Sequence, residues 1–478
     1  MFGEPVTSLA VAGELLIRLI VVVRILVRRS GQPSARLAWI VVVMLVPVAG
    51  PLLYLLVGEV RLGRRRLRLH AMLREHQREV LGVPHEDHPA ALAPDYAPIA
   101  ALAQSVGGTR ARRGNRIRLI SDSRAMIDAL VADIDAAQLH CHLLSYIYLP
   151  DHSGHAVAEA LIRAARRGVP CRLLVDAIGS KAFLASPLKR HLDQAGVEVV
   201  ASLPVSPLRA LLARMDIRNH RKLAVIDGVI AYAGSQNIAD AAFAPKARYA
   251  PWVDASVRIR GPVAWDLQRL FVEDWFLDSR EWLGEVLAIR PEPEAGGIDA
   301  QIIGTGPMSY NYAMRQVQQA ALHLAREEVV ITSPYLVPDE GTIASIHATA
   351  RCGTNTRLVV PARNDSRMVA AASRSYYADL LESGVDVLEY RQGLLHAKTM
   401  TVDGRLSILG SANLDRRSFE INFEVSVIVY SAPFTQELRA LQARYMADAR
   451  AVDPAHWLRL SWPRRLYYNT AGLLGALL

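Results

Sequence analysis

The residues of this chain with the clearest chemical potential occur as two copies of one pattern. The first copy is NHRKLAVIDGVIAYAGSQN, residues 219–237, and the second is LHAKTMTVDGRLSILGSAN, residues 395–413. Both read His-x-Lys, four residues, Asp-Gly, five residues and Gly-Ser-x-Asn. A structural duplication could preserve a turn glycine or an apolar stripe, but it gives no reason to preserve histidine, lysine and asparagine together. The two copies therefore indicate a functional site.

Each copy carries polar groups that suit a phosphate. LAVID and TMTVD are typical of strands, and residues i and i+2 of a strand point to the same face. The histidine and lysine of each copy therefore project together, as His220 with Lys222 and His396 with Lys398. The Asp-Gly after each strand predicts a hairpin turn that returns Gly-Ser-x-Asn to the same place. The candidates for hydrogen bonds to phosphate are then Ser235, Asn237, Ser411 and Asn413.

Two such half-sites that face each other would place imidazoles on opposite sides of one phosphorus. Displacement at phosphorus needs a nucleophile and a leaving-group acid in line, and two ammonium groups can offset the charge on the equatorial oxygens. Mg²⁺ has that task in many other phosphoryl enzymes. No Asp, Glu and His cluster in the sequence has metal-ligand spacing, and the three cysteines form no C-x-x-C pair. We therefore expect a reaction that needs neither a metal nor a cofactor.

Predicted strands and helices repeat in the same order around both copies. Strand, helix and strand are expected at 142–150, 156–168 and 171–178, and again at 329–338, 342–353 and 356–362. This alternation predicts an α/β fold on a largely parallel sheet. The segment RPEPEAGG (290–297), rich in proline and glycine, is expected to link a first unit, 116–290, to a second unit, 291–478.

Residues 1–60 are expected to form a membrane region of two hydrophobic helices. Leu37 to Val57 is a run of 21 residues without a charge, which is enough to cross a bilayer core. The stretch from Val6 to Val27 carries Glu14, Arg18 and Arg24, so it either spans as the first half of a hairpin or lies in the interface. The hairpin is the favoured interpretation.

The chain is basic, with a formal net charge of +9, which suggests an anionic partner. Residues 61–115 are expected to be a basic connector, and its arginine cluster favours the cytoplasmic side and attracts anionic headgroups. The cluster consists of Arg61, Arg64, Arg65, Arg66 and Arg68. Aromatic residues make up only 6% and do not alternate with basic stretches, so we expect no nucleic-acid partner. The C-terminal HWLRLSWPRRLYYNTAGLLGALL is expected either to dock at the membrane interface or to pack on the domain.

The duplicated motif resembles the signature of the phospholipase D superfamily. More narrowly, NHRKLAVID, GSQNIAD and GSANLDRRSFEINFE resemble the bacterial cardiolipin synthases, as does an N-terminal membrane hairpin followed by LVGEVRLGRRR. The superfamily resemblance covers the chain from about residue 116 onward. It implies two phospholipase D-like α/β sandwich units in a pseudo-twofold arrangement.

The resemblance also implies roles for the motif residues. His220 is similar to the nucleophile that forms a phosphatidyl-histidine, and His396 to the acid that protonates the departing alcohol and then activates the incoming one. Lys222 and Lys398 match phosphate-binding positions, as do the serines and asparagines of both copies.

Four acidic residues complete the expected site. Asp227 and Asp403 belong to the motif and are counted here with the catalytic residues, although superfamily members use them structurally. Another acid usually orients each imidazole through its Nδ1. Asp254 in PWVDASV and Glu424 in INFEV match those positions, at 34 and 28 positions after the histidine of the same unit.

The expected reaction is phosphatidyl transfer at the bacterial inner membrane, with the catalytic units on the cytoplasmic side. Phosphatidylglycerol would be the donor, glycerol would leave, and a second phosphatidylglycerol would attack to give cardiolipin. The motifs equally suit a phospholipase D hydrolase or transfer to another alcohol such as serine, and less well a nuclease of the superfamily. A lipid-binding scaffold without activity would leave the paired motifs unexplained.

Overall fold

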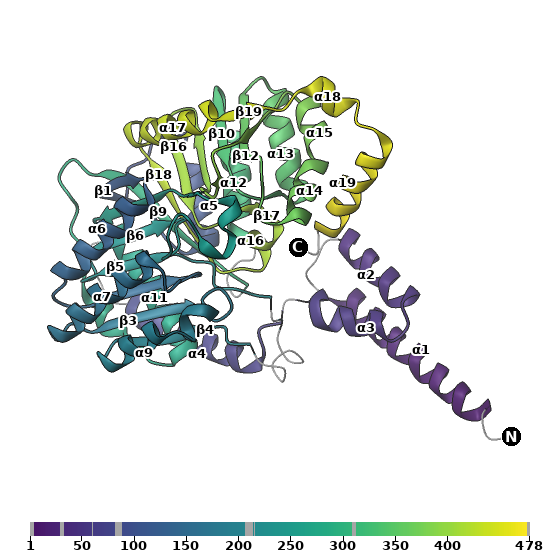
Figure 1. Ribbon diagram of the computed structural model, residues 1–478, viewed down its shortest axis with the longest axis horizontal. Helices are drawn as coiled ribbons and strands as arrows, with labels where there is room; N and C mark the ends of the chain where they lie inside the picture. Colours follow the sequence, from purple (N-terminus) through teal and green to yellow (C-terminus); the bar gives the residue numbers. More distant parts are fainter. Residues whose placement is uncertain are drawn as a thin grey trace. The chain divides into compact units, whose positions relative to one another are not determined.

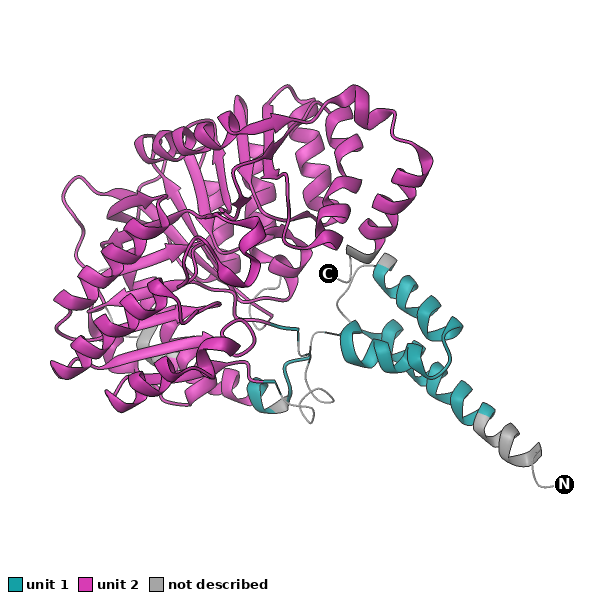
Figure 2. Cartoon of the chain, viewed as in Figure 1, with its two compact units in different colours: residues 1–67, 205–217 teal, residues 68–204, 218–478 magenta. Residues whose placement is uncertain are grey.

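The computed structural model describes residues 4–28, 33–59, 61–81, 88–205, 214, 216–307 and 312–475. They belong to two compact units, and Figure 2 shows each in its own colour. One comprises residues 1–67 with 205–217, and the other comprises 68–204 with 218–478. Both copies of the motif lie in the second unit.

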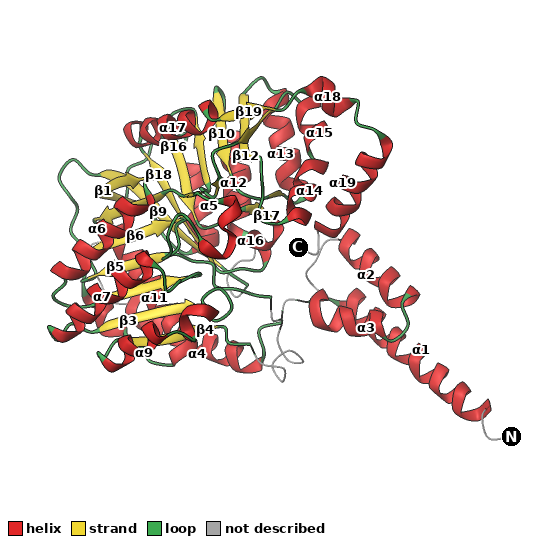
Figure 3. Ribbon diagram, viewed as in Figure 1, coloured by secondary structure: helices red, strands yellow, loops and turns green. Residues whose placement is uncertain are grey.

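The N-terminal unit is built from helices in the part that the structure describes (Figure 3). They are α1 (Glu4–Val27), α2 (Pro33–Leu45), α3 (Ala49–Leu53) and the π-helical turn η1 (Tyr54–Gly58). Val21, Ile25, Val43 and Tyr54 form their shared core. The charges on α1 are paired, because Arg18 contacts Glu14 at 2.6 Å and Arg24 contacts Glu59 at 2.7 Å.

The uncharged run from Leu37 to Val57 does not form the continuous helix that the sequence suggests. α2 ends at Leu45, and the chain turns at Val46–Val48 before α3 begins. Pro47 has no N–H to continue the helical ladder, and its ring clashes with the preceding turn. The chain then folds back so closely that a Cβ on Gly50 would lie 2.5 Å from the carbonyl oxygen of Val42. Among the described helices, we find none whose length and apolarity together suffice for a membrane crossing.

The second unit is organised around one mixed sheet of fifteen described strands (Figure 1). Its first half, from the centre outward, contains β1 (Arg112–Ile120), β8 (Ser256–Arg260), β6 (Ile230–Gly234), β5 (Leu223–Ile226), β2 (Cys141–Ser145), β3 (Cys171–Asp176) and β4 (Glu198–Ser202). Its second half contains β9 (Ile298–Thr305), β18 (Glu424–Tyr430), β16 (Leu406–Gly410), β15 (Thr399–Val402), β10 (Glu328–Thr332), β12 (Asn355–Pro361), β13 (Asp386–Tyr390) and β19 (Ala449–Ala451). The two halves meet where β1 pairs with β9.

The order of strands is the same in both halves, which is the pseudo-twofold arrangement that the resemblance implies. β5 and β15, which follow the two histidines, hold the same place in each half. The sheet is less parallel than the alternating pattern predicts. Parallel pairing joins β2, β3 and β4 in one half and β10, β12 and β13 in the other, whereas the central strands pair antiparallel. The hairpin at each Asp-Gly turn contributes to this, since the three residues between the paired strands, 227–229 and 403–405, reverse the strand direction.

Helices cover both faces of the first half. α6 (Ser123–Ala136) and α7 (His152–Arg166) pack side by side on one face, and α11 (Val263–Ser279) covers the other (Figure 1). Successive side chains of a strand point to opposite faces of the sheet. Leu143 therefore enters the core beneath α6 and α7, while Leu144 packs against α11.

The second half has equivalent layers. α12 (Ala313–Leu324) and α13 (Glu340–Arg351) take the places of α6 and α7, and α17 (Ala432–Ala447) takes the place of α11. Beyond α13 lie α14 (Arg367–Ser375), α15 (Tyr377–Glu382), α18 (Pro454–Leu458) and α19 (Trp462–Gly475).

The expected connector contributes directly to the folded core. α4 (Arg64–Leu81) places Leu73 against Phe276 and Leu277 of the first half. α5 (Ala97–Gly107) places Ile99 and Ala103 in the core of the second half. The first strand, β1, begins at Arg112 rather than at residue 116.

Candidate active site

A cleft of about 780 Å³ lies where the two halves of the second unit meet. The first half contributes His220 and Asn237 to its lining, and the second contributes His396 and Asn413. The two imidazoles therefore share one cavity, which is the arrangement that the duplicated motif predicts.

Backbone hydrogen bonds between the halves fix both histidines. The amide of His220 donates to the carbonyl of Phe423 at 2.9 Å, just before β18. The amide of His396 donates to the carbonyl of Val253 at 2.7 Å, where β14 (Leu394–Leu395) pairs with β7 (Trp252–Val253). Each histidine thus lies on a segment that is held by the opposite half.

This pairing brings each imidazole to an acid of the other half. His220 Nδ1 lies 3.0 Å from both carboxylate oxygens of Glu424, and His396 Nδ1 lies 2.6 Å from Oδ1 of Asp254. The pairing within each unit that the sequence spacing suggests, His220 with Asp254 and His396 with Glu424, is wrong. The unequal spacings of 34 and 28 positions have no structural consequence, because each acid orients the histidine of the other copy.

The two motif serines hold the acids and do not line the cleft. Ser235 Oγ donates to Asp254 at 2.6 Å, and Ser411 Oγ donates to Glu424. The amides of Ala255 and Val425 donate to the same hydroxyls at 3.0 Å. Both serines are fully buried, so their predicted role as phosphate ligands is wrong: the carboxylate and the backbone already engage each hydroxyl.

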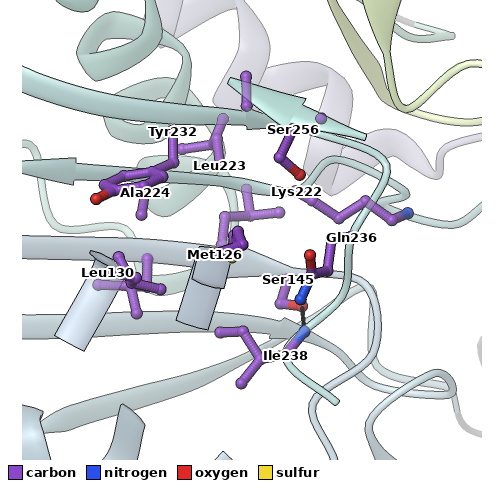
Figure 4. Close-up of a pocket in the computed structure, with 14 residues that line it drawn as sticks. Met126, Leu130, Ser145, Lys222, Leu223, Ala224, Tyr232, Gln236, Ile238 and Ser256 are labelled. Carbon is purple, nitrogen blue, oxygen red and sulfur yellow. Dashed lines mark hydrogen bonds between the residues drawn. The ribbon is translucent and has the colours of Figure 1, made fainter. Parts of the chain in front are cut away.

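The two lysines fold back onto their own histidines. Lys222 Nζ donates to the carbonyl of His220, and Lys398 Nζ to that of His396, each at 2.6 Å. A small cavity of about 20 Å³ lies behind each lysine. Figure 4 shows the one behind Lys222, with the ammonium pointing away from the apolar side chains of Met126 and Leu130. Each ammonium retains further N–H donors for a ligand.

Comparison with known proteins identifies the family. A family model described as "Cardiolipin synthase, PLD-like domain" matches residues 130–275 and 319–445, and one described as "Phospholipase_D-nuclease N-terminal" matches 16–59. Proteins named cardiolipin synthase A from Edwardsiella ictaluri (strain 93-146) and Klebsiella pneumoniae (strain 342) are each 35% identical to the chain, and the alignments cover 99% of both partners. The chain belongs to the cardiolipin synthase family.

A solved structure agrees with this fold. The crystal structure of phosphatidylserine synthase from Haemophilus influenzae Rd KW20 matches 80% of this chain and 98% of its own, with a TM-score of 0.59 and 14% identity. At that identity the likeness shows the fold alone.

The two regions that match the cardiolipin synthase family each contain one copy of the duplicated motif.

In this family member, burial keeps both imidazoles neutral. Desolvation lowers the pKa of His220 to about 4, although Glu424 opposes the shift. Desolvation and the charge of Lys398 lower the pKa of His396 to about 4, against the effect of Asp254. A neutral imidazole that donates its Nδ1–H to a carboxylate keeps a lone pair on Nε2, which is the form a nucleophile needs.

The orienting acids remain charged despite their burial. Desolvation would raise the pKa of Asp254, but His396, Lys398 and Ser235 lower it to about 2. Burial likewise acts against the charge of Glu424, and His220 and Lys222 lower its pKa below the ordinary value. Each buried carboxylate therefore stays charged beside a neutral imidazole.

Asp227 and Asp403 do not belong with the catalytic residues. Asp227 accepts hydrogen bonds from the backbone amides of residues 138–140, and Asp403 accepts from those of residues 326–328. Both lie at the far end of the strand from the histidine, and neither lines the cleft. Counting them as catalytic on the strength of the shared motif is wrong, because they anchor the start of β2 and β10.

Sequence reasoning missed the aromatic and cationic walls of the cleft. The ring of Tyr146 meets His220 edge-on with 4.7 Å between centroids, and Trp252 lies 4.7 Å from His396. Tyr335, Arg218 and Arg417 also line the cavity. A usable signal was present, since Tyr146 and Tyr335 lie within the strands predicted at 142–150 and 329–338.

The first prediction concerns pH. Burial lowers the pKa of Lys398 to about 8, so in the empty cleft its charge is present below that pH and is lost as the pH rises past it. We expect kcat/KM to fall above about pH 8. The corresponding fall in kcat should begin at a higher pH, because a bound phosphodiester favours the charged amine of Lys398. Measuring rates across pH for the wild type and for Lys398→Arg checks this.

The arginine variant should lose that alkaline limb, because a guanidinium stays charged throughout the range. Lys222 also has a pKa well below its ordinary value, owing to burial, so Lys222→Arg is the matched comparison. A limb that persists unchanged in Lys398→Arg would contradict the assignment.

The second prediction separates the motif aspartates from the chemistry. Asp227→Ala should lower stability by about 1–3 kcal/mol, because three backbone amides lose their acceptor. We expect a lower Tm but little change in kcat/KM at a temperature where the variant is folded. Asp128→Ala is the control, since it removes only an exposed contact with Arg124. A catalytic collapse in folded Asp227→Ala would restore that residue to the active site.

Proposed function

We propose that this enzyme makes cardiolipin and glycerol from two molecules of phosphatidylglycerol. Membership of the cardiolipin synthase family supports the substrate class. The observation that carries the proposal is the single cleft that receives both His220 and His396, each oriented through Nδ1 by a buried carboxylate. Two opposed imidazoles suit a double displacement at one phosphorus.

In the first step, Nε2 of His220 attacks the phosphorus of the donor lipid. A P–N bond forms, the P–O bond to the headgroup glycerol breaks, and His396 supplies the proton that glycerol carries away. The arriving phosphodiester raises the pKa of His396, since a nearby anion favours the imidazolium. This effect opposes the burial that keeps the ring neutral in the empty cleft.

In the second step, the hydroxyl of another phosphatidylglycerol gives its proton to His396 and attacks the same phosphorus. The P–N bond breaks, a new P–O bond forms, and His220 is released. One phosphodiester replaces another, so the reaction consumes no external energy. Lys222, Lys398, Asn237 and Asn413 are proposed to bind the equatorial oxygens, where their N–H donors offset the developing charge.

Asn237 is well prepared for this task. Its side-chain oxygen accepts from the amide of Ile147 at 3.1 Å, which orients its NH₂ group as a donor. Lys222 and Lys398 each donate one hydrogen bond to a histidine carbonyl, so the directions of their remaining N–H groups are restricted. Such preorganisation lowers the cost of forming the transition state.

We propose that the N-terminal unit anchors the enzyme at the bacterial inner membrane, with the catalytic unit on the cytoplasmic side. α1 exposes a broad apolar surface that includes Leu16, Leu19 and Ile20, each more than half exposed. An exposed apolar patch of this kind suits lipid better than water. The arginine cluster at 61–68 supports the cytoplasmic orientation.

Purified full-length protein in detergent with phosphatidylglycerol as sole lipid tests the reaction. We expect cardiolipin and glycerol in equal amounts. Phosphatidic acid as the sole lipid product would identify a hydrolase instead, and cleavage of DNA without lipid turnover would identify a nuclease.

The third prediction concerns the intermediate. With phosphatidylglycerol labelled in its phosphate, quenched wild-type enzyme should carry a label that is labile to acid and stable to base, as expected for a P–N bond. His220→Asn should carry none, whereas His396→Asn should retain the label and turn over slowly. The reverse pattern would exchange the roles of the two histidines.

A further inference from the structure

A second cavity, of about 470 Å³, lies beside the catalytic cleft. Its lining includes four arginines and three tyrosines: Arg248, Arg363, Arg367, Arg374, Tyr249, Tyr467 and Tyr468. Among the described residues that line it, none is acidic. A guanidinium cluster of this kind matches the geometry and charge of a phosphodiester.

Two of these arginines are positioned by neighbours and two are open to a ligand. Arg374 donates to the carbonyl of Ala362 at 3.2 Å and contacts Glu389 at 3.3 Å, and Arg248 lies over the ring of Tyr249. Arg363 and Arg367 are exposed at the rim. Arg374 is therefore held in the wall of the cavity, and the side chains of the exposed Arg363 and Arg367 can close on an anion.

One short segment, residues 363–369, contributes to the lining of both this cavity and the catalytic cleft. Asp365, Ser366 and Val369 line the cleft, whereas Arg363 and Arg367 line the second cavity. The opposite wall is divided in the same way, because Lys246 faces the cleft and Arg248 faces the cavity. Lys246 and Asp365, which both line the cleft, form an ion pair at 2.5 Å beside this boundary.

The C-terminal helix indicates that the anion comes from a lipid. α19 packs along α14, where Tyr468 and Ala471 contact Ala371, and Figure 1 shows the two helices side by side. Its outer face exposes Trp462, Leu466 and Leu473, at 75%, 60% and 78% exposure. These positions fall on one stripe of a helix. An apolar stripe with a Trp beside a cationic cavity is typical of a helix that lies in the membrane interface.

We propose that this cavity binds the phosphodiester of the acceptor phosphatidylglycerol while α19 lies in the surface of the bilayer. The inference rests on the proposed function. The hydroxyl that attacks is joined to its own phosphate by a short glycerol chain. We place that phosphate at the four arginines, because Arg363 and Arg367 flank Asp365 of the cleft lining. In the catalytic cleft, the hydroxyl gives its proton to His396 while the P–N bond to His220 breaks and a new P–O bond forms.

The test compares two acceptors of the same phosphatidyl-enzyme. Cardiolipin synthesis needs a lipid acceptor, whereas exchange of labelled glycerol into phosphatidylglycerol needs only a small one. In Arg363→Gln/Arg367→Gln, the ratio of cardiolipin formed to glycerol exchanged should fall about tenfold, because charge-assisted contacts with the lipid phosphate are lost. Full-length protein in mixed micelles with phosphatidylglycerol is used throughout.

Arg166→Gln/Arg190→Gln is the matched control, since it removes the same charge from exposed positions on α7 and on α9 (Pro187–Gln194). Its ratio should equal that of the wild type. An unchanged ratio in Arg363→Gln/Arg367→Gln overturns the acceptor site, as does an equal loss of both activities. If wild-type enzyme binds inorganic phosphate and Arg363→Gln/Arg367→Gln does not, while their two ratios are equal, free phosphate is the occupant and the lipid assignment is wrong.

Failure of the proposed function gives a different result. Wild-type enzyme would then form no cardiolipin and exchange no glycerol, so the acceptor site would fall with it. Wild-type enzyme that performs both reactions, with a variant ratio equal to that of the wild type, would overturn the acceptor site alone.

Discussion

Two backbone hydrogen bonds between the halves of the catalytic unit determine the rest of the site. The His220 amide reaches the carbonyl of Phe423 and the His396 amide reaches that of Val253, at 2.9 and 2.7 Å. Each bond places a histidine beside the acid that follows that carbonyl, Glu424 or Asp254. Neither half therefore holds a complete pair of histidine and acid. Docking of the halves and assembly of the site are one event, so an unassembled half contains an imidazole without its orienting carboxylate.

The same closure explains the electrostatics. Excluding water disfavours every charge in the cleft, which is why the pKa values of His220 and His396 fall to about 4. The two acids stay charged because each accepts from a histidine and a serine. The site is thus arranged before any ligand arrives, with acceptors turned inward and ammonium donors held near the histidines. A phosphodiester supplies the negative charge that the acid-base histidine needs in order to be protonated. The substrate itself completes the charge balance.

The sequence could predict the histidines, lysines and asparagines because their positions follow from strand alternation and a short hairpin turn, which are local rules. It also identified Asp254 and Glu424. It could not predict which acid meets which histidine, since residues about 140 and 200 positions apart meet only through docking of the halves. Ser235 and Ser411 were misassigned because a hydroxyl can serve a phosphate or a carboxylate equally well. The run from Leu37 to Val57 was misjudged because apolarity does not specify helix continuity, which Pro47 interrupts.

Duplication produced a symmetric frame, but its two half-sites are chemically unequal. Glu424 reaches His220 with both carboxylate oxygens at 3.0 Å, whereas the shorter Asp254 meets His396 through one oxygen at 2.6 Å. The lysines differ as well, since burial lowers the pKa of Lys398 to about 8 and that of Lys222 well below its ordinary value. An in-line displacement needs one imidazole as nucleophile and the other as proton carrier. Identical surroundings would not decide which histidine takes which role. The glutamate beside one histidine and the aspartate beside the other therefore make the half-sites different at the place where the chemistry requires two different partners.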